Sequence, residues 1–203
     1  MVFYLYETQK WISMTVPLAH EQFIQVYPNV LGENLCHALI ELLENSPHLQ
    51  MRVDNDQRPS FTQISLQRMV DGQKYIEPIT NAMKQCFQRY IHNLPDFATY
   101  FPHQFSLEQY RVKKYKNDNI DVFEDHVDVH DYTSARRFLA CLFYLNTIEQ
   151  GGETEFLLST HNKVIQPIQG SVVVFPPNWQ FPHRGRKTIS DNKYILSSYF
   201  HFV

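Results

Sequence analysis

A histidine and an aspartate two residues apart form the pair in this sequence with the clearest metal-binding chemistry. His126 and Asp128 lie in the run Phe-Glu-Asp-His-Val-Asp-Val-His, residues 123–130. If this run is a strand, residues i and i+2 point to the same face, so an imidazole nitrogen and a carboxylate oxygen can meet at one point. Two histidines and one carboxylate on one face of an octahedral iron(II) leave three positions open. The pair alone also fits an ordinary polar strand face.

A third ligand is expected from a later strand on the far side of a barrel mouth. His183 follows the apolar run 170–175, and ten residues later Lys193 begins the last expected strand. A cation there can pair with the distal carboxylate of a dicarboxylate cosubstrate. His130 shares the strand face of the first pair, but three ligands from one short strand would be badly strained. We therefore assign His130 to the rim or to the substrate side.

Two different periodicities predict the elements that position these residues. Residues 33–45 and 75–93 repeat apolar side chains at helical spacing. Between them, residues 53–60 predict a polar loop and residues 64–69 a short strand. From residue 105 the period changes to two, with turn residues between the runs. The expected strands are 106–116, 122–129, 137–146, 154–158, 162–167, 171–175 and 194–203.

This pattern predicts an α+β fold that is mainly β, with N-terminal helices packed on the outside of a double-sheet core. The 203 residues suit one domain. We expect a helical support region over about residues 20–95 and the β core over about 105–203.

Composition narrows the class of protein. An apolar share of 43% with 14% aromatics argues against a disordered chain. A net charge of -3 does not provide the excess of positive charge that binding to long duplex nucleic acid requires. Three isolated cysteines argue against a secreted disulfide framework and predict a protein of the reducing cell interior. Residues 1–10 do not read as a signal peptide, and no apolar run is long enough to span a membrane. We therefore expect a soluble, cytoplasmic protein that contacts no membrane.

Several ordered motifs, taken together, resemble a known family. The runs are 137–146 (Arg-Phe-Leu-Ala-Cys-Leu-Phe-Tyr-Leu-Asn), 151–156 (Gly-Gly-Glu-Thr-Glu-Phe), 170–176 (Gly-Ser-Val-Val-Val-Phe-Pro), His183 and Lys193-Tyr194. This order resembles the iron(II)/2-oxoglutarate dioxygenases of the prolyl 4-hydroxylase type, over about residues 105–203 and more loosely over 23–43. The resemblance implies a double-stranded β-helix, or jelly-roll, core.

The resemblance also implies roles for single residues. His126, Asp128 and His183 match the catalytic Fe(II) ligands, and Lys193 matches the residue that binds the C5 carboxylate of 2-oxoglutarate. Tyr115 and Tyr144 match tyrosines that contact this cosubstrate, although a strand tyrosine also fits core packing. Ascorbate is implied as the reductant. This chain has Tyr199 where many prolyl hydroxylases have Trp, and Asp128 favours hydroxylation because related halogenases lack that carboxylate.

The expected reaction is hydroxylation of a C–H bond with molecular oxygen and release of succinate and CO2. The substrate is a prolyl or other side chain of a protein or peptide, with a small metabolite or nucleobase, or a non-catalytic binding module, as alternatives. Residues 53–63 and 117–125 are the expected substrate loops. The basic cluster Arg184, Arg186 and Lys187 predicts a solvated loop, or else contact with an acidic or phosphate-bearing substrate. Oligomeric state is open.

Overall fold

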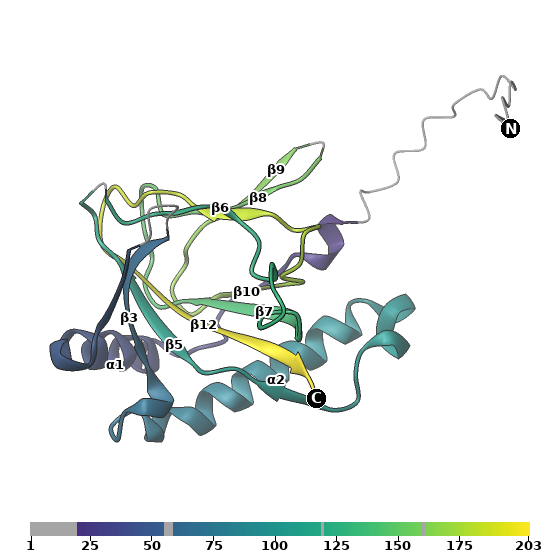
Figure 1. The fold of residues 1–203 in the computed structure, drawn as a ribbon, viewed down its shortest axis with the longest axis horizontal. Helices are drawn as coiled ribbons and strands as arrows, with labels where there is room; N and C mark the ends of the chain where they lie inside the picture. Colours follow the sequence, from purple (N-terminus) through teal and green to yellow (C-terminus); the bar gives the residue numbers. More distant parts are fainter. Residues whose placement is uncertain (1–19, 55–58, 119, 160) are drawn as a thin grey trace, which may run out of the picture.

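The computed structural model describes residues 20–54, 59–118, 120–159 and 161–203 (Figure 1). Within these ranges the chain forms two β-sheets and two α-helices, α1 (Glu33–Glu44) and α2 (Ile76–His92). Both predicted helices are therefore confirmed. No helix in the described ranges is long and apolar enough to cross a membrane. The prediction about residues 1–10 lies outside the described residues, as do parts of both expected substrate loops.

The strands form a larger and a smaller sheet. Among the described residues the larger sheet has the order β1-β10-β7-β12-β5-β3-β2, with β4 beside β12, and the smaller has the order β6-β11-β8-β9. The larger sheet contains β1 (Gln25–Tyr27), β2 (Met51–Asp54), β3 (Ser60–Ser65), β4 (Phe105–Leu107), β5 (Arg111–Tyr115), β7 (Arg137–Tyr144), β10 (Val172–Phe175) and β12 (Lys193–Phe202). The smaller contains β6 (Phe123–His126), β8 (Thr154–Leu157), β9 (Asn162–Ile165) and β11 (His183–Gly185). The mainly-β prediction is confirmed.

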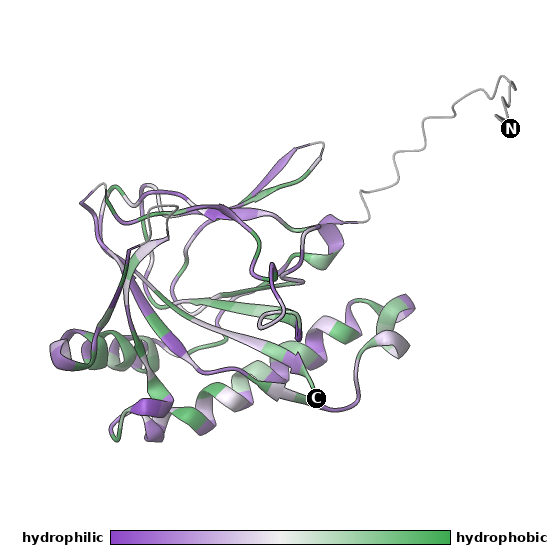
Figure 2. Cartoon of the chain, in the orientation of Figure 1, coloured by the Kyte–Doolittle hydropathy of each residue, from purple (hydrophilic) through white to green (hydrophobic). Residues whose placement is uncertain are grey.

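Two hydrophobic clusters lie on opposite faces of the larger sheet. Helix α1 buries Cys36, Leu39 and Leu43 at helical spacing, and these residues share one cluster with Val112 and Leu196 of the sheet. The other cluster combines side chains from both sheets, namely Phe61, Tyr115, Ala140, Tyr144, Phe156, Ile165, Val173, Phe175, Ile195 and Tyr199, with Ile24 and Phe181. Figure 1 shows α1 and α2 on the side of the larger sheet away from β6 and β8. Figure 2 shows the contrast between β7, which is largely hydrophobic, and β6, which is largely hydrophilic.

Four predicted elements differ from the structure. The expected strand at 106–116 is two strands, β4 and β5, and the expected loop at 53–60 is entered from β2. The expected strand at 64–69 ends at Ser65 and continues as a 3-10 helix. The expected strand at 122–129 ends at His126, because the backbone N–H groups of Asp128 and Val129 turn aside to donate to the carbonyl oxygen of Pro177.

Candidate active site

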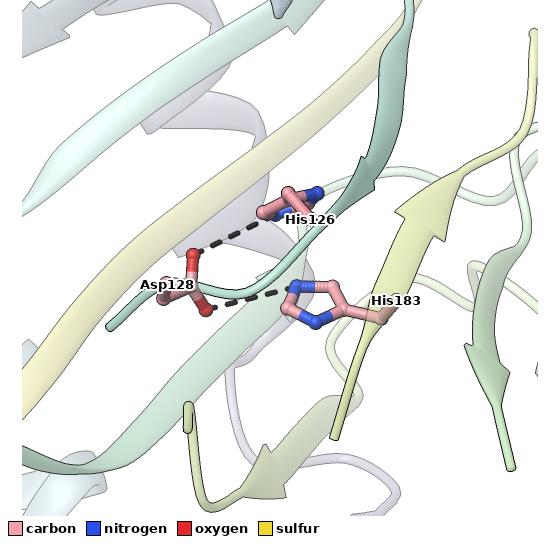
Figure 3. A group of neighbouring side chains, drawn as sticks. All are labelled: His126, Asp128 and His183. Atoms are coloured by element: carbon pink, nitrogen blue, oxygen red, sulfur yellow. Dashed lines mark ion pairs between the residues drawn. The ribbon is translucent and has the colours of Figure 1, made fainter. Parts of the chain in front are cut away.

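The two predicted metal-binding histidines come from neighbouring antiparallel strands of the smaller sheet. His126 is the last residue of β6 and His183 the first of β11, and the two are direct partners in the antiparallel register. Asp128 follows β6, so it meets His126 after a turn and not by strand alternation. Its Oδ1 lies 3.6 Å from His126 Nε2, and its Oδ2 lies 3.6 Å from His183 Nε2 (Figure 3). Among the described residues this is the one group of three such side chains close enough to share a metal ion.

Backbone carbonyls fix the tautomer of both imidazoles. His126 Nδ1 lies 2.7 Å from the carbonyl oxygen of Glu124, and His183 Nδ1 lies 3.0 Å from that of Phe181. Because a carbonyl only accepts, each Nδ1 carries the hydrogen and each Nε2 keeps its lone pair for the centre of the group. Burial lowers the pKa of His183 to about 4, which keeps this imidazole neutral at neutral pH.

The ligand set fits a divalent transition metal. His126 Nε2 is buried and has no hydrogen-bond partner within the part of the chain that the structure describes. A buried acceptor without a partner is costly in an apolar interior, and coordination by a metal removes that cost. Two imidazole nitrogens and one carboxylate are the donors of an Fe(II) facial triad. The Tyr199 hydroxyl donates to Asp128 Oδ1 at 2.9 Å and orients this carboxylate.

Lys193 lies in the same cavity as His126, Asp128 and His183. It is the first residue of β12, is 4% exposed, and donates from Nζ to the carbonyl oxygen of Gly152 at 2.6 Å. In the described ranges no carboxylate lies within ion-pair distance of it. Burial lowers the pKa of Lys193 to about 8. A buried cation with no carboxylate in ion-pair distance marks a place where a ligand carboxylate would be stabilised.

The turn that supplies the Gly152 carbonyl requires glycine. Gly151 and Gly152 have φ values of +74° and +73°, a region that side chains rarely adopt. A Cβ at Gly151 would also meet the carbonyl oxygen of Lys187 at 2.3 Å. This close approach brings the turn against the segment that follows β11.

The two tyrosines of the predicted site differ in position. Tyr115 faces Lys193 across the register of β5 and β12 and lines the cavity. Tyr144 is fully buried, and its hydroxyl donates to Thr154 Oγ1 at 2.8 Å. Thr154 is part of the cavity wall, whereas Tyr144 lies behind it. Its ring is nevertheless 5.4 Å from Lys193 Nζ.

The basic cluster after His183 is bound internally in the structure. Arg184 Nε and Arg186 Nε donate to Glu155 at 2.7 and 2.9 Å, and Glu155 is 2% exposed. Lys187 and Arg186 of the predicted cluster are exposed, but among the described residues only Lys187 has no carboxylate within ion-pair distance. His130 is exposed and lines an outer groove that adjoins the ligands, as expected of a rim residue.

Sequence reasoning missed two residues of the site. Lys113 is buried in the wall of the cavity, two residues before Tyr115. Strand alternation places Lys113 and Tyr115 on one face, and this was the signal that could have revealed it. Tyr199 departs from the family pattern, and its hydrogen bond to Asp128 depends on the folded arrangement of β12 beside the turn after β6.

Comparison with known proteins agrees with this arrangement. The model of the 2OG-Fe(II) oxygenase superfamily matches residues 110–201. A collagen prolyl hydroxylase of Paramecium bursaria Chlorella virus-1 is 18% identical and has a TM-score of 0.67, over 89% of this chain and 96% of that one. A Trichoplax adhaerens prolyl hydroxylase, bound to a hypoxia inducible factor peptide, is 14% identical with a TM-score of 0.72, over 89% and 84%. A Pseudomonas putida prolyl-4-hydroxylase is 16% identical with a TM-score of 0.66, over 89% of this chain and 93% of that one.

Residues 110–201 therefore match the 2OG-Fe(II) oxygenase superfamily, and this match supports a dioxygenase, as the sequence predicted. Its fold is that of the prolyl 4-hydroxylases. The match to this superfamily implies Fe(II), 2-oxoglutarate, molecular oxygen and a substrate to be oxidised. No curated protein sequence matched in the corresponding search.

Proposed function

We propose that this chain hydroxylates a prolyl or other side chain of a protein or peptide, with His126, Asp128 and His183 as Fe(II) ligands. The observation that carries the proposal is the convergence of two imidazole lone pairs and a carboxylate beside a buried lysine that lacks an ionic partner in the described ranges. Bound Fe(II), together with 2-oxoglutarate and oxygen, supplies oxidation of a C–H bond with release of succinate and CO2.

Lys193 would bind the C5 carboxylate of 2-oxoglutarate, with Tyr115 beside it in the cavity wall. The Gly152 carbonyl already orients the ammonium through one hydrogen bond, which leaves further N–H donors for the carboxylate. Tyr144 would act on the same carboxylate only through Thr154. Tyr199 holds Asp128 in place, and Phe123 stacks on the His126 ring at 3.5 Å, which restricts rotation of that ligand.

The finer features of the fold belong to the same proposal. Two facing sheets that share one inner cluster support a double-stranded β-helix, and the outer cluster supports a single domain of helical region and β core. Three free, buried cysteines agree with a cytoplasmic location. The peptide substrate is supported by the fold shared with a prolyl hydroxylase that binds a peptide. Ascorbate is the proposed reductant.

Purified protein with Fe(II) and ascorbate should convert 2-oxoglutarate to succinate slowly, and a prolyl peptide should accelerate this turnover. His126→Ala should abolish turnover and metal binding while the protein stays folded, because the two remaining protein ligands are too few to retain the metal ion. His130→Ala is the matched control and should keep both. Turnover that no peptide accelerates would favour a small metabolite or nucleobase as substrate. Metal retention by His126→Ala would contradict the assignment of the ligands.

A further inference from the structure

Lys113 is a second buried lysine in the active-site cavity. It lies on β5, is 8% exposed, and is the register partner of Gln63 on β3 and of Ile195 on β12. Its Nζ lies 4.8 Å from the ring centre of Phe61 and 5.8 Å from that of Phe123. The strand therefore directs this ammonium inward, between two aromatic rings and toward the side of the site where Asp128 lies.

Within the described ranges Lys113 Nζ forms neither a hydrogen bond nor an ion pair. Other cations at this side of the site are already compensated. Arg137 donates to both carboxylate oxygens of Glu108, at 2.9 and 2.8 Å, and Arg111 contacts the same carboxylate at 3.2 Å. Burial disfavours the charged form of Lys113, whereas the carboxylates of Asp128 and Glu108 favour it from a distance. A buried ammonium with no acceptor in contact is unfavourable for folding, so its presence at a cavity wall requires an explanation outside stability.

Lys113 lies at the junction between the inner cavity and the outer groove. It lines both, together with Phe123, His126 and Asp128, whereas Lys193 lines only the inner cavity. Gln63 lines the outer groove, and its amide makes no hydrogen bond with the residues that the structure describes. Lys113 is two residues along β5 from Tyr115, which corresponds to about 7 Å along a strand. The ammonium is thus displaced from the proposed C5 carboxylate site toward the substrate side.

We propose that Lys113 binds a carboxylate of the substrate to be oxidised, so that the enzyme selects acidic peptides. The inference rests on the proposed function and narrows its substrate class. Lys113 would donate to the carboxylate from between the two rings, and Gln63 would offer its amide N–H beside it. Because one ammonium is available and the neighbouring arginines are held by Glu108, the site suits a singly charged carboxylate better than a phosphate.

The test compares two pools of N-acetylated, C-amidated peptides with a central proline. The pools differ only in having Glu and Asp, or Gln and Asn, at the positions next to proline. Wild-type protein should turn over the acidic pool with a kcat/KM roughly 30-fold higher, the lower end for a buried charge pair. Lys113→Met keeps the methylene chain between the rings and should abolish this preference, while Lys113→Glu should reverse it.

Lys114→Met is the matched control on the same strand. Lys114 faces the opposite side of the sheet and pairs with Glu44 at 2.7 Å, so the preference for the acidic pool should persist in this variant. An equal response of wild-type protein to both pools, or a preference that survives in Lys113→Met, would overturn the proposal.

Two further measurements separate this inference from the proposed function. Binding of 2-oxoglutarate to Zn(II)-loaded Lys113→Met and wild-type protein is measured by calorimetry. A loss of 2-oxoglutarate affinity as large as the loss for acidic peptides would assign the ammonium to the cosubstrate and overturn the proposal. If wild-type protein lacks Fe(II)-dependent turnover, the proposed function fails. Equilibrium dialysis of the two pools against Zn(II)-loaded protein then still decides whether Lys113 selects acidic peptides.

Discussion

Replacement of Lys193 separates cosubstrate binding from metal binding. Lys193→Ala should leave Fe(II) affinity nearly intact and raise the KM for 2-oxoglutarate by roughly 30-fold to several thousand-fold, since truncation of a buried charge pair costs about 2–5 kcal/mol. Lys193→Arg should do less damage, because it keeps the charge with a different geometry. Succinate release measured against 2-oxoglutarate concentration gives both values. Lys187→Ala, an exposed cation nearby, is the control. An unchanged KM in Lys193→Ala would show that the cosubstrate is anchored elsewhere.

The Tyr199 hydroxyl is predicted to tune metal affinity. Tyr199→Phe removes the hydrogen bond to Asp128 and should weaken Zn(II) or Co(II) binding by about 10–100-fold, the usual effect of losing a group that orients a ligand. Competition with a chelating dye measures this affinity. Tyr194→Phe is matched, because its hydroxyl donates to Glu44 at 2.8 Å on the other face of β12. Equal affinities in the two variants would show that Tyr199 acts only in packing.

The residue types of the ligands could be predicted from sequence, but their surroundings could not. Histidine, aspartate and lysine in a fixed order identify candidates for metal and carboxylate binding without any coordinates. The hydrogen bond from Tyr199 to Asp128 depends on how β12 approaches the turn after β6. The inward direction of Lys113 follows from its alternation with Tyr115, yet its lack of a partner depends on Glu108 being held by two arginines.

At the scale of elements, one acidic residue joins neighbouring strands of the smaller sheet. Glu155 of β8 accepts from Arg184 and Arg186, and these hydrogen bonds lower the pKa of its carboxyl to about 2. Between this pKa and the ordinary value of 4.5 the unfolded chain binds more protons than the folded protein, so stability falls as pH decreases through that window.

Glu155→Gln is therefore expected to unfold more easily than wild-type protein at pH 7, by about 1.5–3 kcal/mol. The difference should shrink as the pH falls from about 4.5 to about 2, because the carboxyl of the unfolded wild-type chain then binds a proton that the folded protein does not yet bind. Urea unfolding at pH 7 and at successively lower pH values measures it. Glu149→Gln, an exposed carboxylate outside the described ion pairs, serves as the control. A difference that is independent of pH would show that charge at Glu155 contributes nothing.

Strands with long apolar or alternating runs were predictable, and short ones were not. The strand expected at 137–146 and the last strand agree closely with β7 and β12. Strand β11 has only three residues, follows a proline and ends in a glycine, so no periodicity can reveal it. It forms because it pairs with both β6 and β8. The end of β6 at His126 is likewise set by contact with a distant loop, through the Pro177 carbonyl.

For the whole molecule, the two hydrophobic clusters predict that stability and cosubstrate binding can be changed separately. Leu39 is fully buried in the outer cluster, between α1 and the larger sheet. Leu39→Ala should reduce the free energy of unfolding by about 2–5 kcal/mol through lost contacts and a residual cavity. Urea unfolding measures this loss, and the KM for 2-oxoglutarate should stay unchanged at temperatures where the variant is folded. A large rise in KM would show that the outer cluster sets the geometry of the site.

The pairing of β6 with β11 gives the metal site a place in folding as well as in chemistry. His126 and His183 are distant in sequence, and they meet only when these two strands are in register. An ion bound between them closes the long stretch of chain that separates them and acts as a reversible cross-link. The concentration of available metal would then set the stability of the pairing between β6 and β11. In the apoprotein this sheet would be the first part of the fold to open and become accessible to proteases.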